Sequence, residues 1–385
     1  MPLFELRKFV APEFIFGVGA RHRVGFYARN LNARRVLVVT DEGVTAAGWL
    51  ADVLDSLGQE GIRSTVFSAL TPNPKDHEVM TGADLYREAA CDVIVAVGGG
   101  SVIDCAKGIG IMAANGGHIL DFEGVDRIPA PGPPLICIPT TAGTSADISQ
   151  FAIICNTSER SKIAIISKTV VPDVALVDPE TTVTMDPYLT ACTGIDALTH
   201  AIEAYVSTAS SPVVDVHALS AIRGIRAHLL DAIADPAKLE PREQMMLASL
   251  QAGLAFSNAS LGAVHAMAHS VGGYLDLPHG ETNALLLEFV VDFNFPTTAE
   301  RYHDIGEALG LDLRGRTSAE QKRLIMEDIR SLRVAAGIHD GLEARGLRTG
   351  YLRDLAHNAV RDACIYTNPR RANAADVEAI YSEAL

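Results

Sequence analysis

Long apolar runs are missing from this chain of 385 residues. No stretch approaches the roughly 18 uninterrupted apolar residues that a membrane-spanning helix needs. Residues 1–10 mix Glu5, Arg7 and Lys8 with apolar side chains, without the basic start and apolar stretch of a signal peptide. We therefore expect a protein with no membrane partner.

Concentrated positive charge is missing too. The chain has 32 Lys and Arg against 47 Asp and Glu, a net charge of −15, and no local run of basic residues offsets this balance. An acidic surface repels phosphate backbones. We therefore expect no nucleic-acid partner.

Clustered cysteine is the third absence. The six cysteines are scattered at positions 91, 105, 137, 155, 192 and 364, and no two form a C-x-x-C pair. Most lie in apolar segments, a pattern typical of buried free thiols in a reducing cytoplasm. The sequence therefore predicts a cytoplasmic protein without a cysteine-based zinc site.

Two halves of the chain differ in pattern. In the first half, short β-branched or apolar runs at 36–40, 64–67, 93–97, 135–138 and 174–177 alternate with helical spacing at 42–57 and 75–90. This alternation predicts a parallel sheet with helices on both sides. After Pro187, helical stretches dominate, at 187–206, 213–232, 241–257, 261–274, 298–309, 319–336 and 352–363. We predict an α/β domain over residues 1–187 and an all-α domain over 188–385.

A glycine-rich turn, Gly98-Gly99-Gly100-Ser101, follows the apolar run at 93–97 and opens a helix. Glycines let backbone N–H groups approach an anion closely, and a helix N-terminus adds partial positive charge that suits a pyrophosphate. The alternative is a tight strand-to-helix turn without a ligand, because the G-x-G-x-x-G pattern is absent here. Gly17-Val18-Gly19 begins such a pattern, but His22 replaces its third glycine, and we predict a plain hairpin there.

Asp41 ends the first clear strand, where a carboxylate can accept hydrogen bonds from an adenosine ribose and repel a 2′-phosphate. This position favours NAD over NADP. The alternative is that Asp41 caps the helix that starts near Glu42. The loop at 139–144, Pro-Thr-Thr-Ala-Gly-Thr, also follows a strand and contributes hydroxyls to the same crevice, unless it is an ordinary Ser/Thr loop.

Histidines and a carboxylate recur at helical spacing in the second half. Asp196 and His200 lie four residues apart, as do His265 and His269, and His279 follows a helix end. Histidines in such apolar segments must be hydrogen-bonded or bind something. A satisfied core histidine is the common explanation for one such pair, but two pairs and a third histidine indicate a catalytic divalent ion with nitrogen and oxygen ligands. Position 266 is Ala, so the H-E-x-x-H pattern of metalloproteases is absent.

Over nearly its whole length the chain resembles the iron-containing, or group III, alcohol dehydrogenases. The resemblance rests on G-G-G-S-x-x-D-x-x-K at 98–107, P-T-T-A-G-T at 139–144, G-x-D-A-L-T-H-A-x-E-A-Y at 194–205, H-x-M-A-H at 265–269 and L-P-H-G at 277–280. The most similar branch holds lactaldehyde reductases, 1,3-propanediol dehydrogenases and bacterial ethanol dehydrogenases. After Thr144 the family continues Gly/Ala-Ser/Ala-Glu, whereas this chain has Ser145-Ala146-Asp147, so we expect a difference in loop geometry and not in the reaction.

The resemblance implies a Rossmann-like N-terminal domain and a helical C-terminal domain, the dehydroquinate synthase-like architecture, with NAD(H) in the cleft between them. It also implies a homodimer or larger homo-oligomer. The implied ligands of an Fe²⁺ or Zn²⁺ ion are Asp196, His200, His265 and His279, with His269 close by. Positions matching cofactor contacts are Asp41, Asn73, Gly99, Gly100, Ser101, Asp104, Thr140, Thr141, Thr144 and Lys162, and those near the substrate pocket are Phe256 and Cys364.

These features predict an NAD- and metal-dependent alcohol dehydrogenase or aldehyde reductase that acts on a small primary alcohol or diol. We hypothesise that His269 relays the alcohol proton; the alternative is that it only shapes the pocket. Three other functions remain open. A dehydroquinate-synthase-like lyase would need basic clusters, in which the helical half is poor, and a maleylacetate-reductase-like enzyme would lack the complete ligand set that this chain has. The third is a non-catalytic metal-binding protein.

Overall fold

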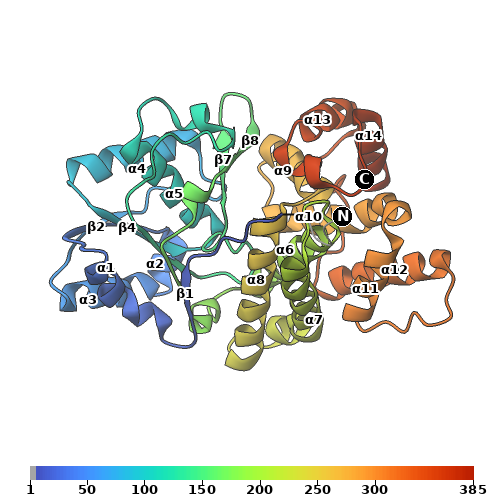
Figure 1. The fold of residues 1–385 in the computed structure, drawn as a ribbon, viewed down its shortest axis with the longest axis horizontal. Helices are drawn as coiled ribbons and strands as arrows, with labels where there is room; N and C mark the ends of the chain where they lie inside the picture. Colours follow the sequence, from blue (N-terminus) through green and yellow to red (C-terminus); the bar gives the residue numbers. More distant parts are fainter. Residues whose placement is uncertain (1–5) are drawn as a thin grey trace.

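A six-stranded sheet forms the centre of the N-terminal half of the computed structural model, which describes residues 6–385 and not the first five residues of the opening segment (Figure 1). All its strand pairs are parallel. The strand order is β1 (Glu13–Phe16), β9 (Val174–Val177), β6 (Leu135–Pro139), β4 (Val93–Gly98), β2 (Arg35–Val39) and β3 (Arg63–Phe67). The predicted parallel sheet is confirmed, with β1 as the one strand of it that the sequence pattern missed.

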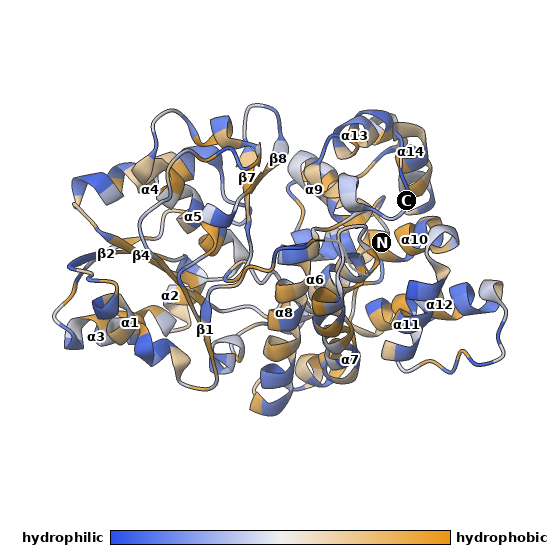
Figure 2. Cartoon of the chain, viewed as in Figure 1, coloured by the Kyte–Doolittle hydropathy of each residue, from blue (hydrophilic) through white to orange (hydrophobic). Residues whose placement is uncertain are grey.

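Helices cover both faces of this sheet because successive side chains of a strand point to opposite faces. Val36 and Val38 of β2 share a buried cluster with residues of α1 (Val24–Asn30) and α3 (Trp49–Gln59). Leu37 and Val39 share another with α4 (Asp76–Glu88) and α5 (Gly100–Ala114). Figure 2 shows the central strands as hydrophobic, whereas the helices outside them carry hydrophilic residues on their outer sides. Strands buried on both faces explain the continuous apolar runs of the sequence.

An antiparallel hairpin interrupts the alternation of strands and helices. β7 (Phe151–Asn156) pairs with β8 (Ser161–Ile166), and the short β5 (Gly124–Val125) joins β8. These strands were not predicted from the sequence, because an antiparallel hairpin lacks the strand–helix–strand alternation of a parallel sheet. The hairpin brings Phe151 and Lys162 beside the helical half.

Two local predictions were wrong. Residues 17–19 form no hairpin: β1 pairs in parallel with β9, and the chain then enters a 3₁₀ helix, η1 (Ala20–Arg23). The helix expected at 42–57 is two helices, α2 (Glu42–Ala46) and α3, separated at Gly48. Gly48 has φ 91°, a backbone conformation that side chains with a Cβ rarely adopt.

The C-terminal half is helical, as predicted. Its helices are α6 (Pro187–Val206), α7 (Pro212–Ala234), α8 (Leu239–Ala259), α9 (Ala263–Leu275), α10 (His279–Asn294), α11 (Ala299–Ala308), α12 (Ser318–Ala335), α13 (Leu352–Ala359) and α14 (Ala374–Glu383). The sequence analysis missed α10 and α14. Across residues 6–385, no helix is long and apolar enough to cross a membrane.

Helix α6 is the centre of this half. It begins where Pro187 follows Asp186, whose carboxylate accepts the backbone N–H of Leu189, a favourable N-cap. From Thr190 to Val206 every residue is buried. A helix buried on all sides holds its polar side chains in fixed positions, and α6 carries Asp196 and His200.

Candidate metal and cofactor site

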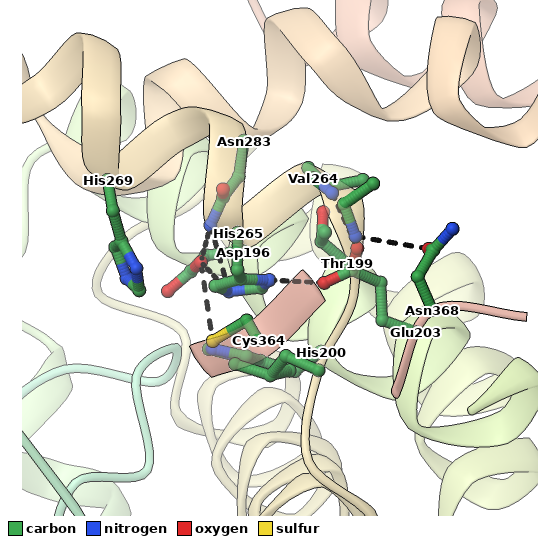
Figure 3. Close-up of polar contacts among 12 residues, drawn as sticks. Asp196, Thr199, His200, Glu203, Val264, His265, His269, Asn283, Cys364 and Asn368 are labelled. Carbon is green, nitrogen blue, oxygen red and sulfur yellow. Dashed lines mark hydrogen bonds and ion pairs between the residues drawn. The ribbon is translucent and has the colours of Figure 1, made fainter. Parts of the chain in front are cut away.

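Four side chains from helices α6, α9 and α10 converge in the helical half. Asp196 and His200 lie one turn apart on α6, His265 lies in the first turn of α9, and His279 begins α10. From Oδ1 of Asp196 the distances to the Nε2 atoms are 3.9 Å for His200, 3.7 Å for His265 and 3.8 Å for His279. Figure 3 shows Asp196, His200 and His265 turned toward one another. All four donor atoms lie within 4.8 Å of one another, so the group could hold a metal ion.

Burial and mutual contact keep most of this group in the protonation states that a cation needs. Burial opposes ionisation of Asp196, but the adjacent His200 and His279 hold its pKa well below the usual range. Burial lowers the pKa of His200 to about 3 and lowers the pKa of His279 well below its usual value. An ionised carboxylate and neutral imidazoles are the forms that bind divalent ions.

The side-chain amide of Asn283 points its Nδ2 into this group. Nδ2 lies 2.6 Å from Oδ1 of Asp196, 3.1 Å from Nε2 of His265 and 3.2 Å from Nε2 of His279. The N–H dipoles therefore face the lone pairs that a cation would use. Oδ1 of Asn283 and Nδ1 of His279 are buried and have no hydrogen-bond partner among the described residues. Buried polar atoms without partners are rare. The donor set itself, one carboxylate and three imidazoles, fits a divalent ion.

Two carboxylates contact the Nδ1 atoms of histidines at the site. Oε2 of Glu203 lies 2.5 Å from Nδ1 of His265, and Oδ2 of Asp362 lies 2.8 Å from Nδ1 of His269. Glu203, Asn283 and Asp362 were not among the site residues predicted from the sequence. Glu203 follows Asp196 by seven residues and Asn283 follows His279 by four, so helical spacing points to both. Asp362 is 93 residues from His269, and no local pattern connects them.

His269 lies beside the four-residue group and outside it. Its ring stacks on the ring of His279 at 5.3 Å between centroids and meets that of His265 at 6.1 Å. His269, Asp362 and Cys364 form a second close group. Cys364 is fully buried, and its thiol lies close to His269 and Asp362. It is not among the residues that line the small cavity beside Phe256.

A cleft of about 1380 Å³ runs from the sheet to this group. It is lined by two of the ligand candidates, Asp196 and His279, and by eight of the ten residues matched to cofactor contacts: Asp41, Asn73, Gly99, Gly100, Ser101, Thr140, Thr141 and Thr144. The other two, Asp104 and Lys162, line a smaller cavity of about 100 Å³ together with Phe256, Phe151, Leu261 and the histidines. The structure thus brings the predicted cofactor residues to one side of the predicted metal ligands.

The glycine turn sits at the N-terminus of α5 and faces this cleft. Neither Gly99 nor Gly100 has a positive φ, so backbone conformation does not require glycine at these positions. The lack of room for a side chain does. A Cβ on Gly99 would lie 3.1 Å from Thr141, and one on Gly100 would lie 2.8 Å from Thr144. The close approach of the 139–144 loop leaves bare backbone N–H groups at the cleft wall.

Asp41 does cap a helix, as the alternative interpretation predicts: its Oδ1 accepts the N–H of Val44 at 2.8 Å. The same side chain also lines the cleft, so the two interpretations are compatible.

Polar contacts bridge the two halves of the chain at the cleft. Asp276, which follows α9, accepts from Nδ2 of Asn73 at 2.8 Å and from Nζ of Lys75 at 3.0 Å. Lys162 donates to Oδ1 of Asn73 at 2.8 Å. Asn73 and Asp276 both have positive φ, 57° and 53°. The segment that leads to His279 is thereby tied to the N-terminal half.

Two relatives resemble the chain over nearly its full length. It is 38% identical over 371 residues to 1,3-propanediol dehydrogenase from Klebsiella pneumoniae, covering 96% of each chain. It is 36% identical over 377 residues to the NAD-dependent methanol dehydrogenase from Bacillus methanolicus, covering 98% of this chain and 99% of that one. The crystal structure of a 1,3-propanediol oxidoreductase superposes with a TM-score of 0.95 at 37% identity, covering 99% of this chain and all of the other.

Two family models match, iron-containing alcohol dehydrogenase over residues 11–179 and the C-terminal part of the Fe-containing alcohol dehydrogenase family over residues 190–385. These matches, the full-length similarity to alcohol and diol dehydrogenases and the shared fold confirm the resemblance seen in the sequence motifs. The chain belongs to the iron-containing alcohol dehydrogenase family and is an oxidoreductase of the alcohol dehydrogenase type.

Proposed function

We propose that this chain interconverts a small primary alcohol or diol and its aldehyde, using NAD(H) and one divalent ion, Fe²⁺ or Zn²⁺. The observation that carries the proposal is a single cleft that joins the glycine turn and Asp41 at one end to Asp196 and His279 at the other. A dinucleotide lying along this cleft would bring its reactive ring beside the four-residue group. In its family this arrangement serves alcohols, which agrees with the substrates that the names of both relatives state.

Asp196, His200, His265 and His279 would hold the ion. When bound, such an ion supplies Lewis acidity that lowers the pKa of an alcohol hydroxyl. With the ion bound, the side chains would contribute one negative charge and three neutral rings. Asn283 donates to the carboxylate at 2.6 Å, which fixes the oxygen that faces the rings. Three helices would therefore determine where the ion lies.

The cofactor would lie with its pyrophosphate on the backbone of Gly99 and Gly100, at the positive end of α5. Thr140, Thr141, Thr144 and Ser101 would donate hydroxyl hydrogen bonds along the same wall. Asp41 would receive the ribose hydroxyls and exclude a 2′-phosphate. NAD supplies the hydride acceptor, and the residues of the cleft orient it.

Phe256 would bound the substrate end, because its ring stacks on His200 at 4.3 Å and packs against Phe151 at 5.7 Å. A small cavity with aromatic walls favours small, weakly polar substrates. His269, with Nδ1 held by Asp362, presents its Nε2 on the cavity side and would accept the alcohol proton there. The Cys364 thiol lies within 4.8 Å of the donor atoms of His269 and Asp362 and would support them by packing.

Three further proposals concern the whole chain. We place the boundary between the two domains at residues 187 and 188, where α6 begins. We propose a homodimer or larger homo-oligomer, supported by the open edge of β1, where Phe14 is exposed. We propose a cytoplasmic location, supported by six cysteines that are all buried and unpaired.

A spectrophotometric assay tests the proposal. The purified full-length protein, loaded with Fe²⁺ or Zn²⁺, is mixed with NADH and a panel of small aldehydes, and absorbance is followed at the nicotinamide band. We expect turnover that requires the metal and prefers NADH. His279→Ala should bind little metal and lose activity, because removing one of four ligands changes both the charge and the geometry of the site. Turnover in the metal-free protein, or full metal occupancy in His279→Ala, would contradict the proposal.

A further inference from the structure

We propose that Glu203 is a positioning residue for the metal site: it keeps the His265 ring in the tautomer and orientation that present Nε2 to the ion. This inference rests on the proposed metal site and names a residue behind it. Glu203 would not touch the ion, the substrate or the cofactor.

Glu203 is buried on the same face of α6 as two of the ligand candidates. Asp196, His200 and Glu203 stand at positions i, i+4 and i+7, which align along one side of a helix. The Glu203 side chain is 3% exposed and the His265 side chain 1%. Figure 3 shows the carboxylate reaching the side of the His265 ring opposite Asp196. One helix therefore contacts both ring nitrogens of His265, Asp196 on Nε2 and Glu203 on Nδ1.

The two oxygens of Glu203 accept from two different donors. Oε2 lies 2.5 Å from Nδ1 of His265, and Oε1 accepts the backbone N–H of Val264 at 2.7 Å. Because a carboxylate only accepts, Nδ1 must carry a proton, so a neutral His265 ring keeps its lone pair on Nε2. The second bond anchors the carboxylate to the start of α9, whose N-cap residue, Gly262, has no side chain to cap it. The Glu203 carboxylate thus holds both the His265 ring and the first turn of α9.

Among the three ligand rings of the described chain, His265 is the one whose Nδ1 contacts a carboxylate. Nδ1 of His279 has no hydrogen-bond partner there. Metal-ligating histidines commonly donate their second N–H to a carboxylate or carbonyl, which fixes the tautomer and raises ligand basicity. Among these three rings, the site therefore depends on Glu203 for the one that a carboxylate holds.

Glutamine at this position has nearly the same shape but cannot serve both donors. If its oxygen accepts from Val264, its NH₂ faces Nδ1 of His265, and the ring proton must move to Nε2, the atom meant for the ion. If its oxygen accepts from His265 instead, the NH₂ opposes the N–H of Val264, and a buried donor is left unsatisfied. Either arrangement disfavours the metal-bound state.

The test measures the affinity of the full-length protein for Zn²⁺ by competition with a chromophoric chelator. We expect Glu203→Gln to bind Zn²⁺ about 10- to 100-fold more weakly than the wild type, the usual effect of losing such a partner. Wild-type affinity in a folded Glu203→Gln protein, within twofold, would overturn the inference alone. A wild-type chain that binds no Zn²⁺ would overturn both the inference and the proposed function.

Two control variants separate ring positioning from general effects on the fold. Asn368→Ala removes the other side-chain bond to the start of α9, that to the N–H of Ala263 at 3.1 Å, without touching a ring. Glu288→Gln changes a buried glutamate that contacts Arg330 and Arg333 on the far part of α10. Both should bind Zn²⁺ within twofold of the wild type. If Asn368→Ala loses as much affinity as Glu203→Gln, helix capping explains the effect and the inference is wrong.

The wild-type protein provides a second measurement if Glu203→Gln does not fold. In Zn²⁺-loaded protein with ¹⁵N-labelled histidine, we expect the His265 ring to carry a slowly exchanging proton on Nδ1 and to be metal-bound through Nε2. An unprotonated or metal-bound Nδ1 would overturn the inference.

Discussion

Asp41 combines a structural role with a proposed chemical one. Its Oδ1 caps α2 through Val44, and the same carboxylate stands in the wall of the cleft proposed to hold the cofactor. A cap needs only an acceptor oxygen, whereas exclusion of a 2′-phosphate needs negative charge. The two roles can therefore be separated by substitution.

We predict that Asp41→Asn raises the NADPH-to-NADH ratio of kcat/KM while thermal stability stays close to that of the wild type. Asparagine caps helices as well as aspartate does. Two charges at roughly 4 Å repel by about 1 to 4 kcal/mol near a protein surface, so the ratio should rise at least about fivefold. Asp41→Ala is the control, and should also lose about 1 kcal/mol of stability with the cap. Equal use of both cofactors by the wild type would end this argument.

His269 is placed by two contacts beside the proposed metal ligands. Its Nδ1 is held by Asp362, and its ring lies beside His279. We predict that His269→Ala retains its metal but loses turnover by about ten- to a thousandfold, if proton transfer limits the rate. Metal analysis and steady-state kinetics on the same sample check this. Loss of the metal in this variant would show that His269 is a ligand. Unchanged turnover would show that His269 only shapes the pocket.

At the scale of elements, the position of His279 depends on how closely α10 packs on α6. A Cβ on Gly280 would lie 2.4 Å from the carbonyl oxygen of Cys192 and 3.2 Å from Cβ of Asp196. The nearest atom belongs to helix backbone, which cannot rotate away. A side chain at residue 280 therefore has to push α10, and His279 with it, away from Asp196.

We predict that Gly280→Ala lowers both stability and metal affinity. Overpacking of this kind costs about 1 to 3 kcal/mol, and the displaced ligand should weaken Zn²⁺ binding by about tenfold or more. Gly58→Ala, in α3 with nothing within 4 Å of the added Cβ, is the matched control and should be neutral or slightly stabilising. Melting temperature and Zn²⁺ affinity are measured for both proteins. A Gly280→Ala protein indistinguishable from Gly58→Ala would show that α10 can shift without effect.

At the scale of the whole molecule, Asp276 connects the two halves at the cleft proposed to hold the cofactor. It binds Asn73 and Lys75 from the loop after β3, while its own segment leads to His279. The Asp276 side chain is 63% exposed, so solvent screens these contacts and each contributes little. Their position over the cleft matters more than their strength, because a cofactor held in this cleft, as proposed, would have to leave past them.

We predict that Asp276→Ala speeds NADH release by about two- to fivefold, the effect of removing up to roughly 1 kcal/mol of exposed charge contact. Stopped-flow displacement of NADH measures the rate. Asp312→Ala removes an exposed ion pair with Arg314 away from the cleft and should leave the rate unchanged. Identical release from both variants would mean that the bridge does not restrain opening.

The sequence by itself determined what depends on local spacing. Continuous apolar runs predicted the buried parallel strands, because a strand covered on both faces needs apolar side chains throughout. Helical spacing placed Asp196 with His200 and His265 with His269 on common helix faces, and motif resemblance predicted the family that the comparisons confirm. Capping by Asp41 was also open to prediction, because the donor is three residues away.

Tertiary packing alone decided which of these faces meet. Asp362 and His269 are 93 residues apart, Glu203 and His265 62, and Asn283 and Asp196 87, so no periodicity connects them. The β7–β8 hairpin, which brings Phe151 and Lys162 to the cavity, was not predicted, because it is antiparallel and departs from the strand–helix alternation of the parallel sheet. Spacing along a chain specifies the face on which a side chain lies. The partner of that face follows from how the helices and the sheet pack, which is set by contacts distant in sequence.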